Sequence, residues 1–238
     1  MLRTLTEKLF GGIVTRSTIN TMAINHEVDI PYKKATFGMG CFWSGDCVFG
    51  VVPGVLRTRV GYSGGTKPNA NYNNIGDHTE VIEVDFNPDA VSYKQLLHTF
   101  FINHEYGLTK KFKRQYISLI LYHDEEQKKL AEEQKTAEEK KRNIQIVTEI
   151  RPAGIFYPAE DYHQKFKLQR HKYLVNALGL RRNLLQTSHV AARLNGYVVG
   201  LGGLEQFESE VESFGIDQGT ADYVRKLIIE NKGGSLSC

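Results

Sequence analysis

Hydrophobic and polar residues alternate over several short segments in the first half of the chain, and two longer segments carry apolar residues at helical spacing. Alternation predicts half-buried strands, and spacings of three and four residues predict amphipathic helices. The predicted elements are, in order, strand 33–37, helix 41–50, strand 55–61, strand 80–86, helix 91–104 and strand 115–122. This β-α-β-β-α-β order is typical of the split βαβ, ferredoxin-like plait, a two-layer α/β fold.

The second half of the chain is predicted to be mostly helical. Its expected elements are a charged helix at 123–142, a strand at 143–150, a helix at 160–178 with Tyr162, Phe166, Tyr173 and Leu174 on one side, and three amphipathic helices at 191–199, 204–214 and 220–231. The added strand makes a mixed sheet. We therefore expect a disordered N-terminal extension or transit peptide (1–30), an α/β domain (31–180) and a helical C-terminal extension (181–238) whose glycine-rich tail is flexible and carries Cys238.

Composition excludes several classes of protein. With 238 residues, 41% of them hydrophobic and 24% charged, the chain is typical of a soluble globular protein. A net charge of +3 without a dense basic block argues against a nucleic-acid partner. No apolar run is long enough to span a bilayer, so no membrane association is expected. The cysteines and histidines lack metal-ligand spacing, so we expect no metal and no bound cofactor.

The three cysteines, Cys41, Cys47 and Cys238, are too few for a secreted disulfide framework and fit a reducing compartment. We therefore expect a cytoplasmic location. We also expect the protein to be a monomer. Residues 1–22 offer an alternative, because they are rich in Ser and Thr and contain three basic residues but one acid, as in a mitochondrial transit peptide. A disordered extension, or a start at Met22, fits the same composition.

Cys41 is the first candidate for chemistry. It stands in the segment GMGCFW at 38–43, between a predicted strand and a predicted helix and beside the one tryptophan of the chain. Glycines permit a sharp turn, and a following helix directs its N–H groups and positive dipole end at the sulfur, which favours a thiolate. The plain alternative is a buried structural cysteine between core aromatics.

Glu80 and Tyr72 are the next candidates. Glu80 shares the parity of Ile82, Val84 and Phe86 along its strand and therefore points toward the core, where desolvation favours the protonated acid that can donate a proton. A frayed, solvated strand start is the alternative. Tyr72 lies in a long polar loop rich in turn-forming residues, and loops of this length are often functional.

Two chemistries stay open for Cys41 at this point. A cysteine hydrolase or acyl transferase needs a histidine close to the thiol, and His78, His104 and His163 are candidates. Redox chemistry needs a second thiol to resolve an oxidised cysteine, and Cys238 can reach Cys41 from its flexible tail. Cys238 can also be an inert chain end, and we expect Cys47 to be a packed thiol.

A set of motifs follows one another in a specific order and spacing: GCFW at 40–43, GYSGG at 61–65, Tyr72, GDHTE at 76–80, QY at 115–116 and AEDYHQ at 159–164. Over about residues 33–175 the chain thereby resembles the type A peptide methionine sulfoxide reductases, and its details resemble the invertebrate branch of that family. The resemblance implies reduction of methionine S-sulfoxide, in proteins and as the free amino acid, to methionine.

The resemblance also implies roles for individual residues. Cys41 would attack the sulfoxide sulfur and become a sulfenic acid, while Phe42 and Trp43 would form an apolar cage for the substrate methyl group. Glu80 would donate a proton to the sulfoxide oxygen.

By the same resemblance, Tyr72 and Tyr116 would hydrogen-bond to the sulfoxide oxygen. Cys238 would resolve the sulfenic acid by forming a disulfide with Cys41. Thioredoxin, or dithiothreitol in vitro, would then reduce that disulfide, and the other partners would be oxidised proteins and peptides.

The chain departs from the family pattern in places. Ser44 and Asp46 replace a common Gly and Glu, and KFKR at 111–114 replaces an Asp-x-Gly-Thr before the QY pair. His104 or Glu105 are candidates to take the place of the missing aspartate. These departures keep open a third hypothesis, a catalytically inactive binding module built on the reductase fold.

Overall fold

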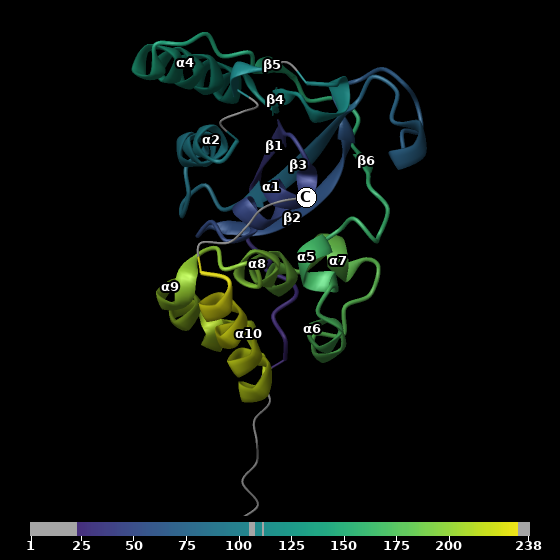
Figure 1. The fold of residues 1–238 in the computed structure, drawn as a ribbon, viewed down its shortest axis with the longest axis vertical. Helices are drawn as coiled ribbons and strands as arrows, with labels where there is room; N and C mark the ends of the chain where they lie inside the picture. Colours follow the sequence, from purple (N-terminus) through teal and green to yellow (C-terminus); the bar gives the residue numbers. More distant parts are fainter. Residues whose placement is uncertain (1–22, 105–107, 111, 233–238) are drawn as a thin grey trace, which may run out of the picture.

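A six-stranded sheet forms the centre of the part of the chain that the computed structural model describes, namely residues 23–104, 108–110 and 112–232. The strand order is β5-β4-β1-β3-β2-β6 (Figure 1). The strands are β1 (Lys33–Met39), β2 (Val55–Ser63), β3 (Thr79–Phe86), β4 (Ser118–Tyr122), β5 (Glu149–Pro152) and β6 (Tyr157–Pro158).

The four inner strands have the ferredoxin-like arrangement that the sequence predicts. β3 runs antiparallel between β1 and β2, with Phe37 opposite Ile82 and Tyr62 opposite Glu80, and β4 is antiparallel to β1 on its other side. Helix α1 (Phe42–Gly50) connects β1 to β2, and α2 (Tyr93–Ile102) connects β3 to β4. β5 pairs parallel with β4, so the predicted mixed sheet is confirmed.

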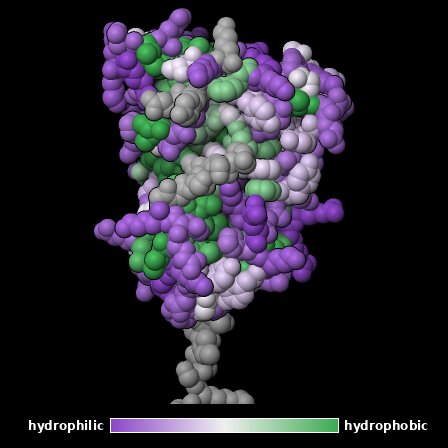
Figure 2. Space-filling view, viewed as in Figure 1, coloured by the Kyte–Doolittle hydropathy of each residue, from purple (hydrophilic) through white to green (hydrophobic). Residues whose placement is uncertain are grey.

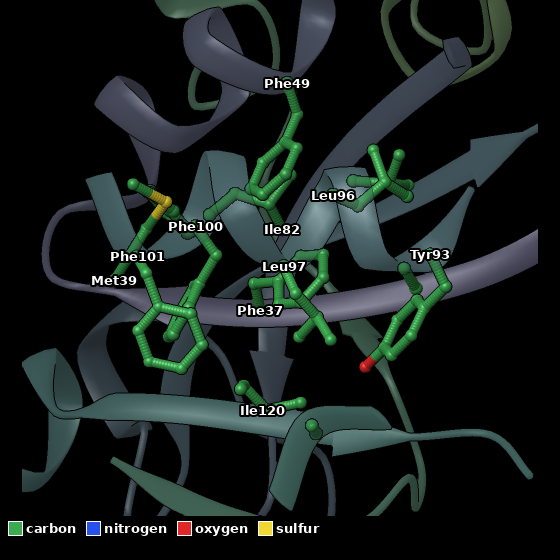
Figure 3. Packing of buried hydrophobic residues seen from close by; sticks show 14 of the residues in the cluster. Phe37, Met39, Phe49, Ile82, Tyr93, Leu96, Leu97, Phe100, Phe101 and Ile120 are labelled. Carbon is green, nitrogen blue, oxygen red and sulfur yellow. The ribbon is translucent and has the colours of Figure 1, made fainter. Parts of the chain in front are cut away.

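One face of the sheet is covered by α1, α2 and the charged helix α4 (Glu125–Arg142), which begins at the Asp124 cap. The main core lies between these layers, where the stacked Phe37 and Phe49 rings are 4.9 Å apart and Phe100 packs against Phe37 at 5.3 Å (Figure 3). Burial of this aromatic surface is the main force that holds α1 and α2 on the sheet.

The opposite face of the sheet carries ion pairs at its centre. Glu83 and Asp85 project from β3 and are nearly buried among three cationic side chains. Lys34 Nζ lies 2.9 Å from Glu83 and 2.7 Å from Asp85, Arg57 Nε lies 2.6 Å from Asp85, and Arg59 Nε lies 2.7 Å from Glu83. The two faces of β3 therefore differ, with apolar residues and Glu80 on the helix side and acids on the other.

The helical C-terminal extension is confirmed. Its helices are α7 (Leu184–Thr187), α8 (His189–Tyr197), α9 (Gly203–Glu210), the 3-10 turn η3 (Val211–Phe214) and α10 (Gln218–Glu230). All of these except α7, which packs against β2, share a second hydrophobic cluster with the short helices α5 (Phe166–Gln169) and α6 (Lys172–Ala177) and with Val51. In Figure 1 these helices lie together at one end of the sheet.

The N-terminal segment before β1 also contacts this helical region. Asn25 N–H donates to the Phe214 carbonyl at 3.0 Å, and His26 Nδ1 lies 2.8 Å from the Ser188 hydroxyl. For these residues the contacts differ from the disorder predicted for 1–30. The transit-peptide hypothesis concerns residues 1–22, which lie outside the described residues.

Three predicted elements are wrong in part. The strand predicted at 115–122 starts at Ser118, because Arg114–Tyr116 forms the 3-10 turn η2. The strand predicted at 143–150 is β5, which starts only at Glu149.

The continuous helix predicted at 160–178 does not form. Residues 160–165 make turns in which Lys165 has φ +50, and only α5 and α6 are helical. The Gln164 side chain bonds to both the N–H and the carbonyl of Val60, at 2.9 and 2.8 Å, so this contact with β2 replaces helical hydrogen bonding. Tyr162 and Tyr173, predicted on the same side of this helix as Phe166 and Leu174, are about half exposed.

Within the described residues, no helix combines the length and the apolar character needed to cross a bilayer. No group of three or more metal-ligating side chains comes together in the same part of the chain. The face seen in Figure 2 is mainly hydrophilic, and hydrophobic residues show in separate small areas.

Candidate active site

Cys41 occupies the N-cap position of α1, directly after β1. Gly40 has φ +83 in the left-handed region, which glycine adopts without strain, and this conformation turns the chain from the strand into the helix. The Ser44 N–H donates to the Cys41 carbonyl at 3.3 Å, so the first helical turn starts at the cysteine. A thiolate here is stabilised by the positive end of the helix dipole.

Glu80 lies beside this turn and is 2% exposed, so its predicted burial is confirmed and the solvated alternative is wrong. Its Oε2 accepts the backbone N–H of Phe42 at 3.1 Å, and its Oε1 accepts the side-chain amide of Gln115 at 2.7 Å. The Phe42 contact places the carboxyl next to the residue that follows Cys41. The buried acid therefore lies beside the turn that carries Cys41, between the end of β1 and the start of β3.

Phe42 and Trp43 continue the site on α1. Phe42 is 1% exposed, while the partly buried Trp43 indole stacks on Phe166 with ring centres 3.7 Å apart and planes 3° apart. The indole Nε1–H donates to His163 Nδ1 at 3.1 Å. The His163 ring also lies 5.1 Å from Phe42. These contacts fix the indole plane beside the cysteine turn and bring Phe42, Trp43, His163 and Phe166 together in one aromatic cluster.

Tyr72 lies in the long loop between β2 and β3 and contacts the same aromatic cluster. It opens the 3-10 turn η1 (Tyr72–Asn74), is 41% exposed, and its ring centre lies 4.8 Å from His163. The backbone N–H of Tyr72 donates to Glu160 Oε1 at 3.0 Å, and the Tyr62 hydroxyl donates to Glu160 Oε2 at 2.9 Å. Glu160 thus anchors the loop that carries Tyr72.

Tyr116 ends the turn η2, next to the Gln115 that binds Glu80. The turn is held by Arg114, whose guanidinium Nη1 lies 2.7 and 2.8 Å from the two oxygens of Glu149. The Thr79 hydroxyl donates to the Arg114 carbonyl at 2.9 Å. Gln115 and Tyr116 are therefore tied to the start of β3, one residue before Glu80.

Burial and hydrogen bonds determine the charges of His163 and Glu160 at the aromatic cluster. Burial lowers the pKa of His163, partly offset by the nearby Glu160 carboxylate, so the imidazole is neutral at neutral pH and Nδ1 can accept the indole proton. Burial would raise the pKa of Glu160, but the N–H of Tyr72 and the hydroxyl of Tyr62 outweigh it and lower that pKa. Glu160 is therefore an ionised anchor.

Two of the three histidines proposed for the hydrolase alternative, His78 and His104, have partners elsewhere, while the third, His163, accepts the indole N–H of Trp43. His78 Nδ1 accepts the Gly65 N–H at 3.1 Å and its Nε2 lies 2.7 Å from the Lys67 carbonyl. His104 is bound to the Phe100 carbonyl at 2.6 Å and to Ser118, and burial lowers its pKa to about 4.

The same contacts bear on the missing family aspartate. His104 points to Ser118 and not to Glu80, while Glu105 and Lys111 lie outside the described residues. Gln115 supplies the side chain that binds the Glu80 carboxyl.

Of the two remaining cysteines, the structure describes Cys47 alone. Cys47 is 0% exposed, and its thiol donates to the Asn195 carbonyl at 3.2 Å, so the packed thiol predicted from the sequence is confirmed. Cys238 lies outside the described residues.

Several contacts of the site are absent from the sequence-based prediction. Gln115 and Glu160 stand inside the quoted motifs without an assigned role, and His163 is a candidate there only for the hydrolase alternative. No sequence signal identifies Phe166 as the partner of Trp43. A cysteine at a helix start, beside a buried acid and a cluster of aromatic rings, is a candidate site for cysteine chemistry.

Comparison with known proteins identifies the family. The sequence model for peptide methionine sulfoxide reductase matches residues 33–193, and a model for the helical domain of selenoprotein methionine sulfoxide reductase A matches residues 179–230. A peptide methionine sulfoxide reductase of Drosophila melanogaster is 50% identical over 214 residues, which cover 90% of this chain and 87% of that protein.

Solved structures agree. Methionine sulfoxide reductase A of Corynebacterium diphtheriae superposes with a TM-score of 0.50 at 26% identity, over 63% of this chain and 83% of that one. Reduced Mxr1 of Saccharomyces cerevisiae has the same fold, with a TM-score of 0.54 at 24% identity over 64% and 93% of the two chains. The chain belongs to the type A peptide methionine sulfoxide reductase family and is an oxidoreductase that reduces methionine sulfoxide.

Proposed function

We propose that Cys41 is the nucleophile for reduction of methionine S-sulfoxide, in proteins and peptides and as the free amino acid. The contact that best supports this is the 3.1 Å hydrogen bond from Phe42 N–H to the buried Glu80 carboxyl, which holds an acid beside the cysteine turn. The Cys41 thiolate attacks the sulfoxide sulfur and forms an S–S bond, while the sulfoxide oxygen takes up two protons and leaves as water. Water then attacks the Cys41 sulfur and the S–S bond breaks, so that methionine leaves, one proton is released and Cys41 becomes a sulfenic acid.

Glu80 is the proposed proton donor to the sulfoxide oxygen. A protonated carboxyl can accept the bonds from Phe42 and Gln115 and still donate its own proton. Tyr72 and Tyr116 are the proposed hydrogen-bond donors to the same oxygen as negative charge develops on it.

Phe42 and Trp43 are the proposed cage for the methyl group of the substrate. The stacking on Phe166 and the bond to His163 support this role, since they fix the indole plane before substrate arrives. A pre-arranged apolar surface holds the reacting sulfur in line with the thiolate at little entropic cost.

Resolution of the sulfenic acid is assigned to Cys238. The burial of Cys47 supports this choice, because a fully buried thiol bonded to Asn195 cannot meet Cys41 without unfolding part of α1. The resulting disulfide between Cys41 and Cys238 would be reduced by thioredoxin, or by dithiothreitol in vitro. A monomeric state and a cytoplasmic location stay predictions, which size-exclusion chromatography and cell fractionation test.

Single-turnover chemistry tests these assignments. One equivalent of a peptide methionine S-sulfoxide, added without reductant, should yield one equivalent of methionine and a Cys41–Cys238 disulfide found by peptide mapping. In the Cys238→Ser variant a 1,3-dione should trap a sulfenic acid on Cys41. A Cys41–Cys47 disulfide would show that the resolving partner is wrong, and an acyl thioester on Cys41 without any need for reductant would favour a hydrolase.

A further inference from the structure

Helix α8 of the C-terminal extension packs directly on the nucleophile helix α1. Two glycines make this approach possible, since a Cβ on Gly50 would collide with the Ala192 carbonyl and a Cβ on Gly196 would collide with the Cys47 carbonyl. The backbones of the two helices are therefore in contact. A shift of α8 must move α1, because no flexible side chains separate them.

Asn195 lies on α8 at this contact and is 0% exposed. Its Nδ2 donates to Asp46 Oδ2 at 3.2 Å and lies 3.3 Å from Cys47 Sγ, so one end of the amide binds α1. Its Oδ1 accepts the backbone N–H of Leu168 in α5 at 3.0 Å. One buried side chain of the helical extension thus joins α1 to α5.

The Asp46 carboxylate strengthens the same junction. Its Oδ1 accepts the Thr58 hydroxyl at 2.5 Å and the Lys165 ammonium at 3.0 Å, and its Oδ2 accepts the Lys165 backbone N–H at 3.1 Å. Asp46 and Lys165 are both 0% exposed. The carboxylate is therefore satisfied from β2, from the residue before α5 and from α8.

The two helices joined by Asn195 carry the two stacked rings of the aromatic cluster. Trp43 belongs to α1, immediately after Cys41 and Phe42, and its stacking partner Phe166 opens α5. The close stacking of these rings depends on the distance between α1 and α5, and the Asn195 side chain is hydrogen-bonded to both helices.

We propose that Asn195 is a positioning residue, through which the helical extension sets the geometry of Cys41 and of the Trp43–Phe166 stack. The inference rests on the proposed function for its effect on the reaction rate. Its effect on the indole environment is independent of activity, because Trp43 is the only tryptophan of the chain and its emission reports on the surroundings of its indole, namely the Phe166 stack and the His163 hydrogen bond.

The test compares Asn195→Ser and Asn195→Asp with a control in the same extension. Serine is too short to reach Asp46 and Leu168, and aspartate keeps the shape but replaces the donor toward Asp46 by an acceptor. The control is Asp217→Ala, which removes the N-cap of α10, where Asp217 accepts the Thr220 N–H at 2.8 Å, and leaves the α1–α8 contact in place.

Full-length proteins are compared by circular dichroism, by the emission maximum of Trp43 and by the single-turnover rate of methionine formation from a peptide S-sulfoxide. We expect both Asn195 variants to show red-shifted emission and a rate about 10- to 100-fold lower, since small displacements of reacting groups have such effects. Asp217→Ala should keep the wild-type emission and rate even if its melting temperature falls by as much as that of the Asn195 variants.

Equal emission and equal rates in the folded Asn195 variants and in Asp217→Ala would overturn the proposal. Should one Asn195 variant fail to fold, the other carries the comparison. Should both fail, the wild-type protein in urea decides, because a change in Trp43 emission that comes only with global loss of helicity would count against local positioning. A wild-type protein without reductase activity would refute the proposed function and leave the emission test intact.

Discussion

Replacing Lys165 by methionine should destabilise the protein strongly. Lys165 and Asp46 form an ion pair at 3.0 Å in which both side chains are 0% exposed, and the ammonium also donates to the Thr58 carbonyl at 2.7 Å. Removing one partner of a buried pair leaves a desolvated charge, which costs about 3–5 kcal/mol. Asp46 keeps donors from Thr58, Asn195 and the Lys165 backbone, so we expect a loss of about 3 kcal/mol, at the lower end of that range.

Urea unfolding followed by circular dichroism measures this loss. The matched control is Lys129→Met, whose pair with Glu133 is solvent-exposed at 3.9 Å and should leave the free energy of unfolding unchanged within error. The double variant Asp46→Asn, Lys165→Met removes both charges and should recover part of the loss. A Lys165→Met protein as stable as the Lys129→Met control would refute the assignment of a desolvated ion pair.

Three further predictions concern the reaction itself. Glu80→Gln should lower kcat with dithiothreitol by about 10²- to 10⁴-fold, because glutamine cannot supply the proton, and steady-state assays against wild type check this. Tyr72→Phe and Tyr116→Phe should each lower kcat by up to about 10²-fold with little change in stability, and unchanged rates would remove the phenols from the mechanism. Trp43 emission should change as the pH falls below 6.5, because burial lowers the pKa of His163 and its protonation occupies the nitrogen that accepts the indole N–H. The free energy of unfolding should fall over the same acid range, and His163→Gln should abolish the emission change.

The fold and part of the site follow from local sequence patterns. The parity of Glu80 with Ile82 and Val84 correctly predicts that it lies on the helix side of β3, where it binds the Phe42 N–H of α1, because side chains alternate strictly along a strand. The glycines around Cys41 predict the turn into a helix for an equally local reason. The strand and helix order predicts the ferredoxin-like sheet, since few topologies accommodate β-α-β-β-α-β.

The contacts that complete the site could not be predicted in this way. Residues 160–165 have a helical pattern, but Gln164 pairs with Val60 and Lys165 is buried on Asp46, more than 100 positions away in sequence. Such long-range bonds override local propensity. The same applies to His163 with Trp43, which are brought together by the packing of α5 on α1.

Turnover of the two sulfoxide epimers tests the central claim most directly. The protein should be incubated with dithiothreitol and a peptide that carries either the S or the R epimer of methionine sulfoxide, beside the Cys41→Ser and Cys47→Ser variants. We predict loss of the S epimer alone, by the wild-type protein and by Cys47→Ser, and no reaction with Cys41→Ser. Persistence of the S epimer, or its reduction by Cys41→Ser, would contradict the account.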